Sequence, residues 1–363
     1  MRTSLCDELG IEHPVFGFTP SEHVAAAISR AGGLGVLGCV RFNDAADLDR
    51  ALTWMDENTD GKPYGVDIVM PATVPKEGTQ IDLASLIPQS HKEFVQQTLL
   101  KLGVPPLPDG EGGEGVLGWL HSVARSHVDV ALEHPIRLIA NALGSPPADI
   151  IERVHAAGVP VAALAGKAEH ARRHVANGVD IVVAQGYEAG GHTGEVATMV
   201  LVPEIVDSVD VPVLAAGGIG SGRQAAAAMA LGASGVWMGS YWLTTAEYAL
   251  GNSSTQQALL AAGSSDTVRT RIYTGKPARL LKTRWTEAWT SAEAPEPLPM
   301  PLQNLLVSEA HQRIARSDDP SVVSMPVGQI VGRMNEVRPV AEVMADLLAE
   351  FDETVKRLAA LGR

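Results

Sequence analysis

The feature that most constrains the fold is a regular alternation of short apolar segments with helical segments that end at glycine. Eight apolar segments recur from residue 14 onward, and several are apolar almost throughout. Strands that are covered on both faces have this composition, which favours a parallel sheet. The predicted strands are PVFGF at 14–18, LGVLGC at 34–39, YGVDIVM at 64–70, IRLIANAL at 136–143, VPVAALA at 159–165, VDIVVAQG at 179–186, VPVLAAGGI at 211–219 and SGVWMGSYW at 234–242.

Amphipathic helical segments separate most of these strands. Four of them, EHVAAAISRAGG, PADIIERVHAAG, AEHARRHVANG and GRQAAAAMALGA, stop at glycine just before the next apolar segment. Glycine commonly ends helices because it accepts a left-handed backbone. Eight β/α units in one direction predict an α/β fold, a closed (β/α)8 TIM barrel. An open doubly wound sheet is the alternative that the pattern leaves open.

Two segments break the alternation. Residues 72–135 are predicted to form a long insertion after the third strand, with a helix over HKEFVQQTLLKLG and an exposed, mobile turn at VPPLPDGEGGEG. Residues 246–363 are predicted to form a mainly helical extension, with an extended Pro-rich stretch at 294–303 and a terminal amphipathic helix. We therefore expect a barrel over 1–245 and an extension that packs on it, as a lid or as a homodimer contact.

Charge and cysteine content exclude several classes of protein. The chain has 42 acidic and 28 basic residues among 363, and no dense basic run, so we expect no nucleic-acid partner. We find neither a signal peptide at the N-terminus nor an apolar stretch long enough to cross a membrane, and predict a cytoplasmic protein. Cys6 and Cys39 are too few for a disulfide framework or a zinc site, so no metal site is predicted.

Three glycine-dense clusters follow the last three predicted strands. They are AQGYEAGGHTG at 184–194, AAGGIGSGR at 215–223 and MGS at 238–240. Barrel enzymes place their active sites at the carboxyl ends of the strands, and the loops after strands seven and eight commonly bind phosphate. The sequence therefore predicts a phosphate site here, although glycines in these positions could also serve only to turn the chain.

The phosphate site can be specified residue by residue. Gly217, Gly218 and Gly239 have no Cβ, so an anion can approach their N–H groups closely. Ser240 adds a hydroxyl, and a helix that begins near Ser221 adds positive partial charge at its N-terminus.

His192 is the candidate catalytic residue. It follows a Gly-Gly pair at the mouth of the sixth strand, whereas the other ten histidines lie in segments that resemble helix faces or surface. A neutral imidazole can take a proton from carbon or donate a hydrogen bond to an anion. The position alone is also compatible with a histidine that only bonds to a loop carbonyl.

Four motifs together resemble the nitronate monooxygenase (2-nitropropane dioxygenase) family. They are AQGYEAGGHTG, AAGGIGSGR, GVWMGSYWL and AISRAGGLGVLG. FMN-dependent enoyl-acyl carrier protein reductases share much of this pattern. The resemblance covers most of residues 1–285, recurs weakly at VGQIVG (327–332) and leaves 72–135 outside.

The resemblance implies FMN as cofactor and assigns residues to it. The FMN phosphate would lie on Gly218 and the Trp237–Ser240 turn, and His192 would lie beside the isoalloxazine ring. The residues that would bind the cofactor are Asp67, Gln185, Gly190, Gly191, Gly217, Gly218, Trp237, Met238, Gly239 and Ser240.

The sequence departs from the family pattern at two places. Asp67 stands where many relatives have an Asn that contacts the flavin, and a carboxyl group donates a hydrogen bond only when it is protonated. The first strand reads VFGFTPSEH instead of an Ala-Pro-Met type of segment, so one wall of the substrate pocket differs.

The implied activity is the oxidation of alkyl nitronates by dioxygen to a carbonyl compound and nitrite, with His192 as the base if neutral nitroalkanes are also used. An NAD(P)H-dependent FMN reductase of an enoyl thioester or quinone is the alternative enzyme. A flavin-binding or metabolite-sensing protein without turnover is the alternative outside enzymes. Replacing His192 with Ala, with FMN retained and activity unchanged, would favour that last alternative.

Overall fold

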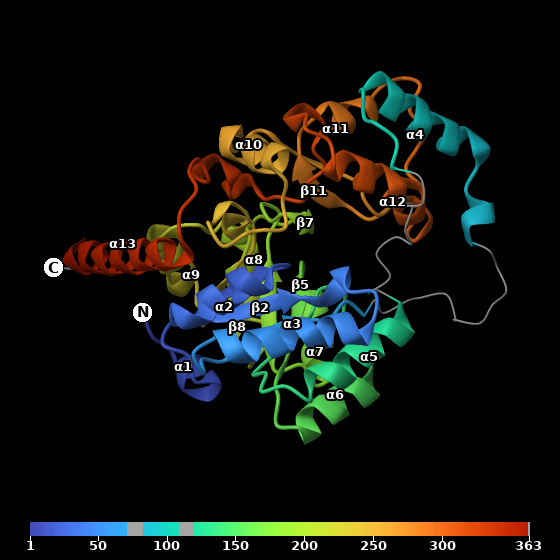
Figure 1. The fold of residues 1–363 in the computed structure, drawn as a ribbon. Helices are drawn as coiled ribbons and strands as arrows, with labels where there is room; N and C mark the ends of the chain where they lie inside the picture. The colour runs from blue at the N-terminus through green and yellow to red at the C-terminus, as the bar shows by residue number, and fades with distance from the viewer. Residues whose placement is uncertain (71–82, 109–119, 362–363) are drawn as a thin grey trace.

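A closed barrel of eight parallel strands forms the centre of the molecule (Figure 1). The computed structural model describes residues 1–70, 83–108 and 120–361. The barrel closes where β9 pairs with β1, which confirms the TIM-barrel prediction and excludes the open sheet. Its strands are β1 (Val15–Thr19), β2 (Leu34–Gly38), β3 (Tyr64–Asp67), β4 (Ile139–Asn141), β5 (Val161–Ala165), β6 (Ile181–Gln185), β8 (Val213–Ala216) and β9 (Gly235–Met238).

Helices cover the outside of the barrel, and local sequence fixes several of their ends. The side chains of Ser21 and Ser221 accept hydrogen bonds from the first turns of α2 and α9. A Cβ on Gly35 would lie 1.9 Å from the Ala25 carbonyl oxygen, so α2 packs with its backbone directly against β2. The covering helices are α2 (Glu22–Arg30), α3 (Ala45–Asn58), α5 (His121–Ala131), α6 (Ala148–Ala156), α7 (Ala168–Ala176), α8 (Thr198–Val206) and α9 (Gly222–Ala230).

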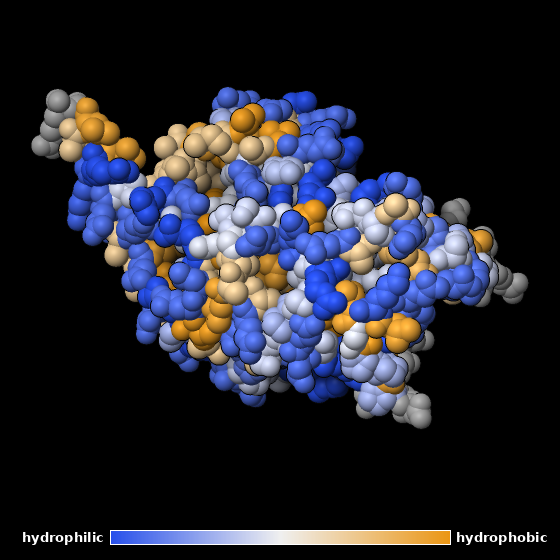
Figure 2. Space-filling model, turned by 90° about the horizontal axis from the view of Figure 1, so that it is seen from above, coloured by the Kyte–Doolittle hydropathy of each residue, from blue (hydrophilic) through white to orange (hydrophobic). Residues whose placement is uncertain are grey.

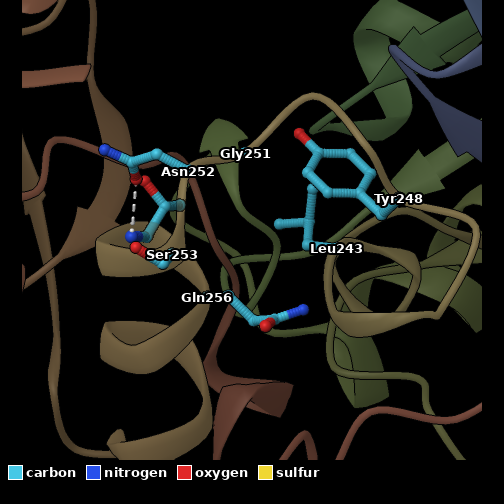
Figure 3. A pocket seen from close by; sticks show the side chains of 7 residues that line it. Leu243, Tyr248, Gly251, Asn252, Ser253 and Gln256 are labelled. Carbon is cyan, nitrogen blue, oxygen red and sulfur yellow. Dashed lines mark hydrogen bonds between the residues drawn. The ribbon is translucent and has the colours of Figure 1, made fainter. Parts of the chain in front are cut away.

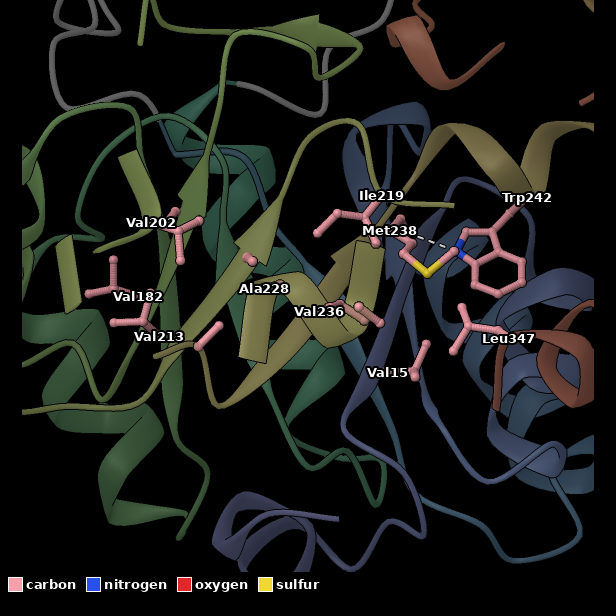
Figure 4. Packing of buried hydrophobic residues seen from close by; sticks show 14 of the residues in the cluster. Val15, Val182, Val202, Val213, Ile219, Ala228, Val236, Met238, Trp242 and Leu347 are labelled. Carbon is pink, nitrogen blue, oxygen red and sulfur yellow. Dashed lines mark hydrogen bonds between the residues drawn. The ribbon is translucent and has the colours of Figure 1, made fainter. Parts of the chain in front are cut away.

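The hydrophobic core has an inner and an outer layer. Inside the barrel, strand side chains such as Phe16, Leu138 and Trp237 pack with residues of α1 (Ser4–Leu9). Outside, the opposite faces of the strands pack against the covering helices, and Figure 4 shows part of this layer around Val182, Val213 and Val236. Burial on both faces explains why the strand segments are apolar throughout.

A second group of elements, here called the upper lobe, lies above the barrel in Figure 1. It consists of an antiparallel sheet in the order β10-β11-β7 and four helices, with a core of its own around Trp285 and Trp289. Its elements are β7 (Gly191–His192), β10 (Thr267–Thr270), β11 (Ala278–Leu281), α4 (Gln89–Lys101), α10 (Ser253–Ala261), α11 (Arg284–Ala288) and α12 (Leu302–Ala315).

The insertion predicted at 72–135 is not confirmed as one unit. Its described residues divide between the two parts of the molecule: α4 packs with α12 in the upper lobe, whereas α5 packs against α3 on the barrel. Both helices are amphipathic, and the sequence of an apolar face does not indicate which element covers it. Most of the predicted turn VPPLPDGEGGEG lies outside the described residues.

The chain returns from the upper lobe to the barrel in its last helix. Two short 3-10 helices, η4 (Pro320–Val322) and η5 (Gln329–Arg333), precede it. Other described loops contain the 3-10 helices η1 (Cys39–Arg41), η2 (Leu83–Leu86) and η3 (Ser240–Thr244). The predicted terminal helix is confirmed as α13 (Val340–Leu361), which packs on α9 and α2. Its far end projects from the body and carries exposed apolar residues such as Leu358 and Leu361 (Figure 2).

Candidate active site at the barrel mouth

The three glycine clusters meet at the carboxyl end of the barrel. Gln185 of β6 is in register with Ala216 of β8, and Ala216 is in register with Trp237 of β9. The loops that follow these strands therefore begin side by side. Gln185 is half-buried at the end of β6, and Gly191 in the loop after it has a φ of 69°, which favours glycine.

Gly217 and Gly218 form the floor of a candidate phosphate cup. Their φ values are 100° and 71°, in the left-handed region. In the described part of the chain, the N–H groups of Gly217, Gly218 and Gly239 donate to no other group. A Cβ on Gly239 would meet no atom closer than Phe18 Cδ1 at 3.6 Å, so there is room for one in ordinary contact with Phe18. Unpaired N–H groups beside a surface without Cβ atoms fit the phosphate of a mononucleotide such as FMN.

Ser240 is held by a residue that the sequence analysis did not place in the site. The N–H of Gly328 donates to Ser240 Oγ at 2.8 Å, so the hydroxyl hydrogen of Ser240 remains able to donate to an anion. Gln329 N–H donates to the carbonyl oxygen of Glu188 at 2.9 Å, and a Cβ on Gly190 would lie 2.7 Å from Gly328 N. The weak motif VGQIVG thus packs directly on the loop after β6.

The N-terminus of α9, which was predicted to add positive partial charge to the phosphate site, faces a carboxylate of the chain itself. The N–H of Gly222 donates to Glu350 Oε2 at 2.8 Å, and Arg223 Nε donates to Glu350 Oε1 at 2.7 Å. A carboxylate of the chain itself therefore already occupies the end of the helix where an anion is stabilised. Glu350 lies 128 residues from Gly222, and no local sequence signal indicated the pairing.

Trp237 and Met238 point away from one another, as neighbours in a strand do. The Trp237 ring stacks in the barrel interior with Phe16 and Phe18, with ring centroids 6.3 Å apart in both pairs. Met238 lies in the outer layer, and its carbonyl oxygen accepts a hydrogen bond from Trp242 Nε1 at 2.8 Å (Figure 4). The groups of this turn that could donate to a phosphate are therefore the backbone of Gly239 and the backbone and hydroxyl of Ser240.

His192 lies on β7, which pairs with β11 of the upper lobe. Its Nε2 is 2.7 Å from the hydroxyl oxygen of Thr274. Burial, with a smaller effect from the nearby Lys276 ammonium, lowers the pKa of His192 to about 4. The imidazole is therefore neutral at pH 7.

His174 lies on a helix face, as predicted, but on the covered face of α7 and not in solvent. Its side chain is buried, with Nδ1 2.7 Å from Ser145 Oγ and Nε2 3.1 Å from the Leu164 carbonyl oxygen. Burial lowers the pKa of His174. A histidine on the covered side of a helix is indistinguishable from an exposed one until the partners of that helix are known.

Asp67 ends β3 and is buried, at 2 % exposed. Its carboxyl group makes no hydrogen bond to the described residues. Burial raises the pKa of Asp67 to about 7. Near neutral pH the protonated form is therefore populated, and in that form the carboxyl group can donate a hydrogen bond as an amide does.

Other candidate sites are absent from the described residues. No three His, Cys, Asp or Glu side chains there are grouped to hold a metal ion. No helix in the same residues is long and apolar enough to cross a membrane. A pocket of about 70 Å³ beside the start of α10, lined by Tyr248, Asn252 and Gln256 among others, contains none of the predicted site residues (Figure 3).

A half-buried, neutral histidine in the loop after β6, together with a candidate phosphate cup at the mouth of a parallel barrel, suits a flavin-dependent barrel oxidoreductase. The model of the nitronate monooxygenase family matches residues 2–350, and the chain belongs to this family. The match extends well beyond residue 285, where the motif resemblance stopped, and its span includes residues 72–135.

Individual relatives agree with this placement. A provisionally named monooxygenase of Mycobacterium tuberculosis is 49% identical, over 99% of both chains. Nitroalkane oxidase from Streptomyces ansochromogenes has a TM-score of 0.82 at 27% identity and covers 98% of this chain and 100% of its own. FabK from Thermotoga maritima has a TM-score of 0.77 at 30% identity, over 99% of both chains.

Proposed function

We propose that the protein uses FMN to oxidise alkyl nitronates with dioxygen, giving a carbonyl compound and nitrite. The observation that carries the proposal is that His192 lies in the loop after β6, and that this loop packs on the turn of Gly217 and Gly218, whose N–H groups are unpaired among the described residues and fit a phosphate. The likeness to a nitroalkane oxidase, and to a provisionally named nitronate monooxygenase of Staphylococcus aureus that is 29% identical over 98% of this chain, supports the same substrate class.

In this proposal the backbone of Gly217, Gly218 and Gly239 holds the FMN phosphate, with the Ser240 hydroxyl beside it. The loop after β6, from Gln185 through Gly190 and Gly191, borders the flavin ring, and Asp67 approaches the ring from β3. FMN supplies the electron transfer between nitronate and dioxygen.

His192 then contacts the substrate directly. A neutral imidazole places no positive charge in the buried site, and it can hydrogen-bond to an oxygen of the nitronate.

Oxygen consumption by purified holoenzyme tests the proposal. With ethylnitronate or propionate 3-nitronate we expect oxygen uptake together with formation of nitrite, and we expect His192→Gln to retain FMN but lose most of the rate. Holoenzyme that binds FMN and consumes no oxygen with either nitronate would contradict the proposal.

The second candidate function is an NAD(P)H-dependent FMN reductase of an enoyl thioester or quinone. It is favoured by the similarity to FabK and by a Rhodococcus jostii carboxyl-CoA dehydrogenase that is 33% identical over 78% of this chain. Anaerobic stopped-flow mixing with NADPH separates the two functions. Rapid bleaching of the flavin favours the reductase, and an unchanged spectrum favours the monooxygenase.

A further inference from the structure

A second side chain fixes the orientation of His192. Thr274 lies between β10 and β11, four residues before Ala278, which pairs with His192 across the small sheet. The Thr274 side chain is buried, at 7 % exposed, and its hydroxyl oxygen is 2.7 Å from His192 Nε2. The contact joins residues 82 positions apart.

The direction of this hydrogen bond follows from the partners of the hydroxyl group. The Thr274 oxygen accepts the N–H of Lys276 at 3.4 Å. Among the described residues, the only acceptor recorded for its hydroxyl hydrogen is His192 Nε2. A buried hydroxyl left without an acceptor is costly, so Thr274 donates and Nε2 accepts. In a neutral imidazole whose Nε2 accepts, the proton lies on Nδ1.

We propose that Thr274 is a positioning residue that holds His192 as the Nδ1–H tautomer and presents this N–H to a negatively charged oxygen of the substrate. His192 Nδ1 has no partner among the described residues and is not among the unpartnered atoms sealed in the interior. The ring then offers the substrate a donor and no basic nitrogen. This assignment rests on the proposed function only for the identity of the substrate, a nitronate anion.

Nitrogen NMR of the holoenzyme tests the tautomer without any substrate. Protein labelled with ¹⁵N-histidine contains 11 histidines, and the signals of His192 are those lost in His192→Gln. We expect a protonated Nδ1 and an unprotonated Nε2 in the wild type and in Thr274→Ser, and a mixture of tautomers in Thr274→Val. A protonated Nε2 in the wild type overturns the proposal, whether or not the enzyme turns over nitronates.

Kinetics with ethylnitronate give a second readout. We expect kcat/KM to fall about tenfold in Thr274→Val, the effect of losing about 1.4 kcal/mol, and to stay within about twofold in Thr274→Ser. Thr290→Val, at an exposed position on the same lobe, is the matched control and should change nothing. Equal rates in Thr274→Val and wild type overturn the positioning role. A wild-type enzyme inactive with every nitronate contradicts the proposed function alone, because the tautomer is still read by NMR.

Discussion

At the scale of single residues, Asp67 is a buried carboxyl group at the end of β3. Its folded pKa, about 7, lies above the ordinary value of 3.8, so folding favours the protonated form. The contribution of this pKa shift to the free energy of unfolding is fully present below pH 3.8 and is lost as the pH rises through 7.

Asp67→Asn should therefore stabilise the apoprotein at pH 8 and have little effect at pH 4. The gain expected at pH 8 is on the order of 4 kcal/mol, measured as the free energy of unfolding in urea at both pH values. Asp352→Asn, at an exposed position on α13, is the control and should show no such dependence. Equal stability of Asp67→Asn and wild type at pH 8 would mean that the carboxyl group is not buried in the folded protein.

The pKa of His192 is shifted in the opposite direction to that of Asp67. Its folded pKa of about 4 lies below the ordinary 6.5, so the ring is neutral throughout the range in which the enzyme is assayed. In the Asp67→Asn background, which removes a buried carboxyl group whose pKa is about 7, we expect kcat/KM for ethylnitronate to be flat from about pH 5.5 to 8. The measurement is a steady-state pH profile, with substrate ionisation determined separately. An inflection near pH 6.5 in this background contradicts a buried, neutral His192.

At the scale of elements, the two strand-to-loop turns that form the cup differ in how much space they leave. Gly239 has a φ of −118°, which any residue adopts, and a Cβ there would make an ordinary contact with Phe18 Cδ1 at 3.6 Å. Gly217 has a φ of 100°, and a Cβ there would lie 3.0 Å from Thr198 Oγ1. The protein therefore tolerates a methyl group at Gly239, whereas an alanine at Gly217 would have a strained backbone.

Gly239→Ala should leave the melting temperature of the apoprotein unchanged and weaken FMN binding about tenfold, or 1.4 kcal/mol. Gly217→Ala should lower both the melting temperature and the affinity, because the left-handed backbone costs about 1–2 kcal/mol. Flavin fluorescence titration and thermal melts measure the two effects. Unchanged FMN affinity in Gly239→Ala would place the phosphate elsewhere.

The packing of α13 on α9 depends on one glycine. A Cβ on Gly222 would lie 2.2 Å from both Leu347 O and Phe351 N, so the two helix backbones are in contact. Gly222→Ala must push α13 away, and overpacking of this kind costs about 1–3 kcal/mol. We expect a lower melting temperature and faster proteolysis within α13 than in Gly251→Ala, an exposed position with room for a methyl group. Identical proteolysis in the two variants would show that α13 is not held this way.

At the scale of the whole molecule, the barrel was predictable and the upper lobe was not. Strands buried on both faces are apolar almost throughout, so all eight appear in the sequence, although the predicted segments run up to four residues past the observed strands, as where the segment 234–242 enters η3. The partner of α4 leaves no such signature, because its apolar face would suit either the barrel or α12. The contacts of His192 with Thr274 and of Ser240 with Gly328 join residues 82 and 88 positions apart. Only the folded chain brings those pairs together.

His192 stands on the sheet of the upper lobe, whereas the glycine cup stands on the barrel strands. In the proposed function, cofactor retention and substrate contact are thus carried by different sheets of one molecule. A preparation in which the two sheets are out of alignment would keep its bound flavin and its yellow colour while turning over slowly. Absorbance would then measure the concentration of bound flavin and not the concentration of active sites. The concentration of active enzyme would have to be measured from the nitrite released in a single turnover.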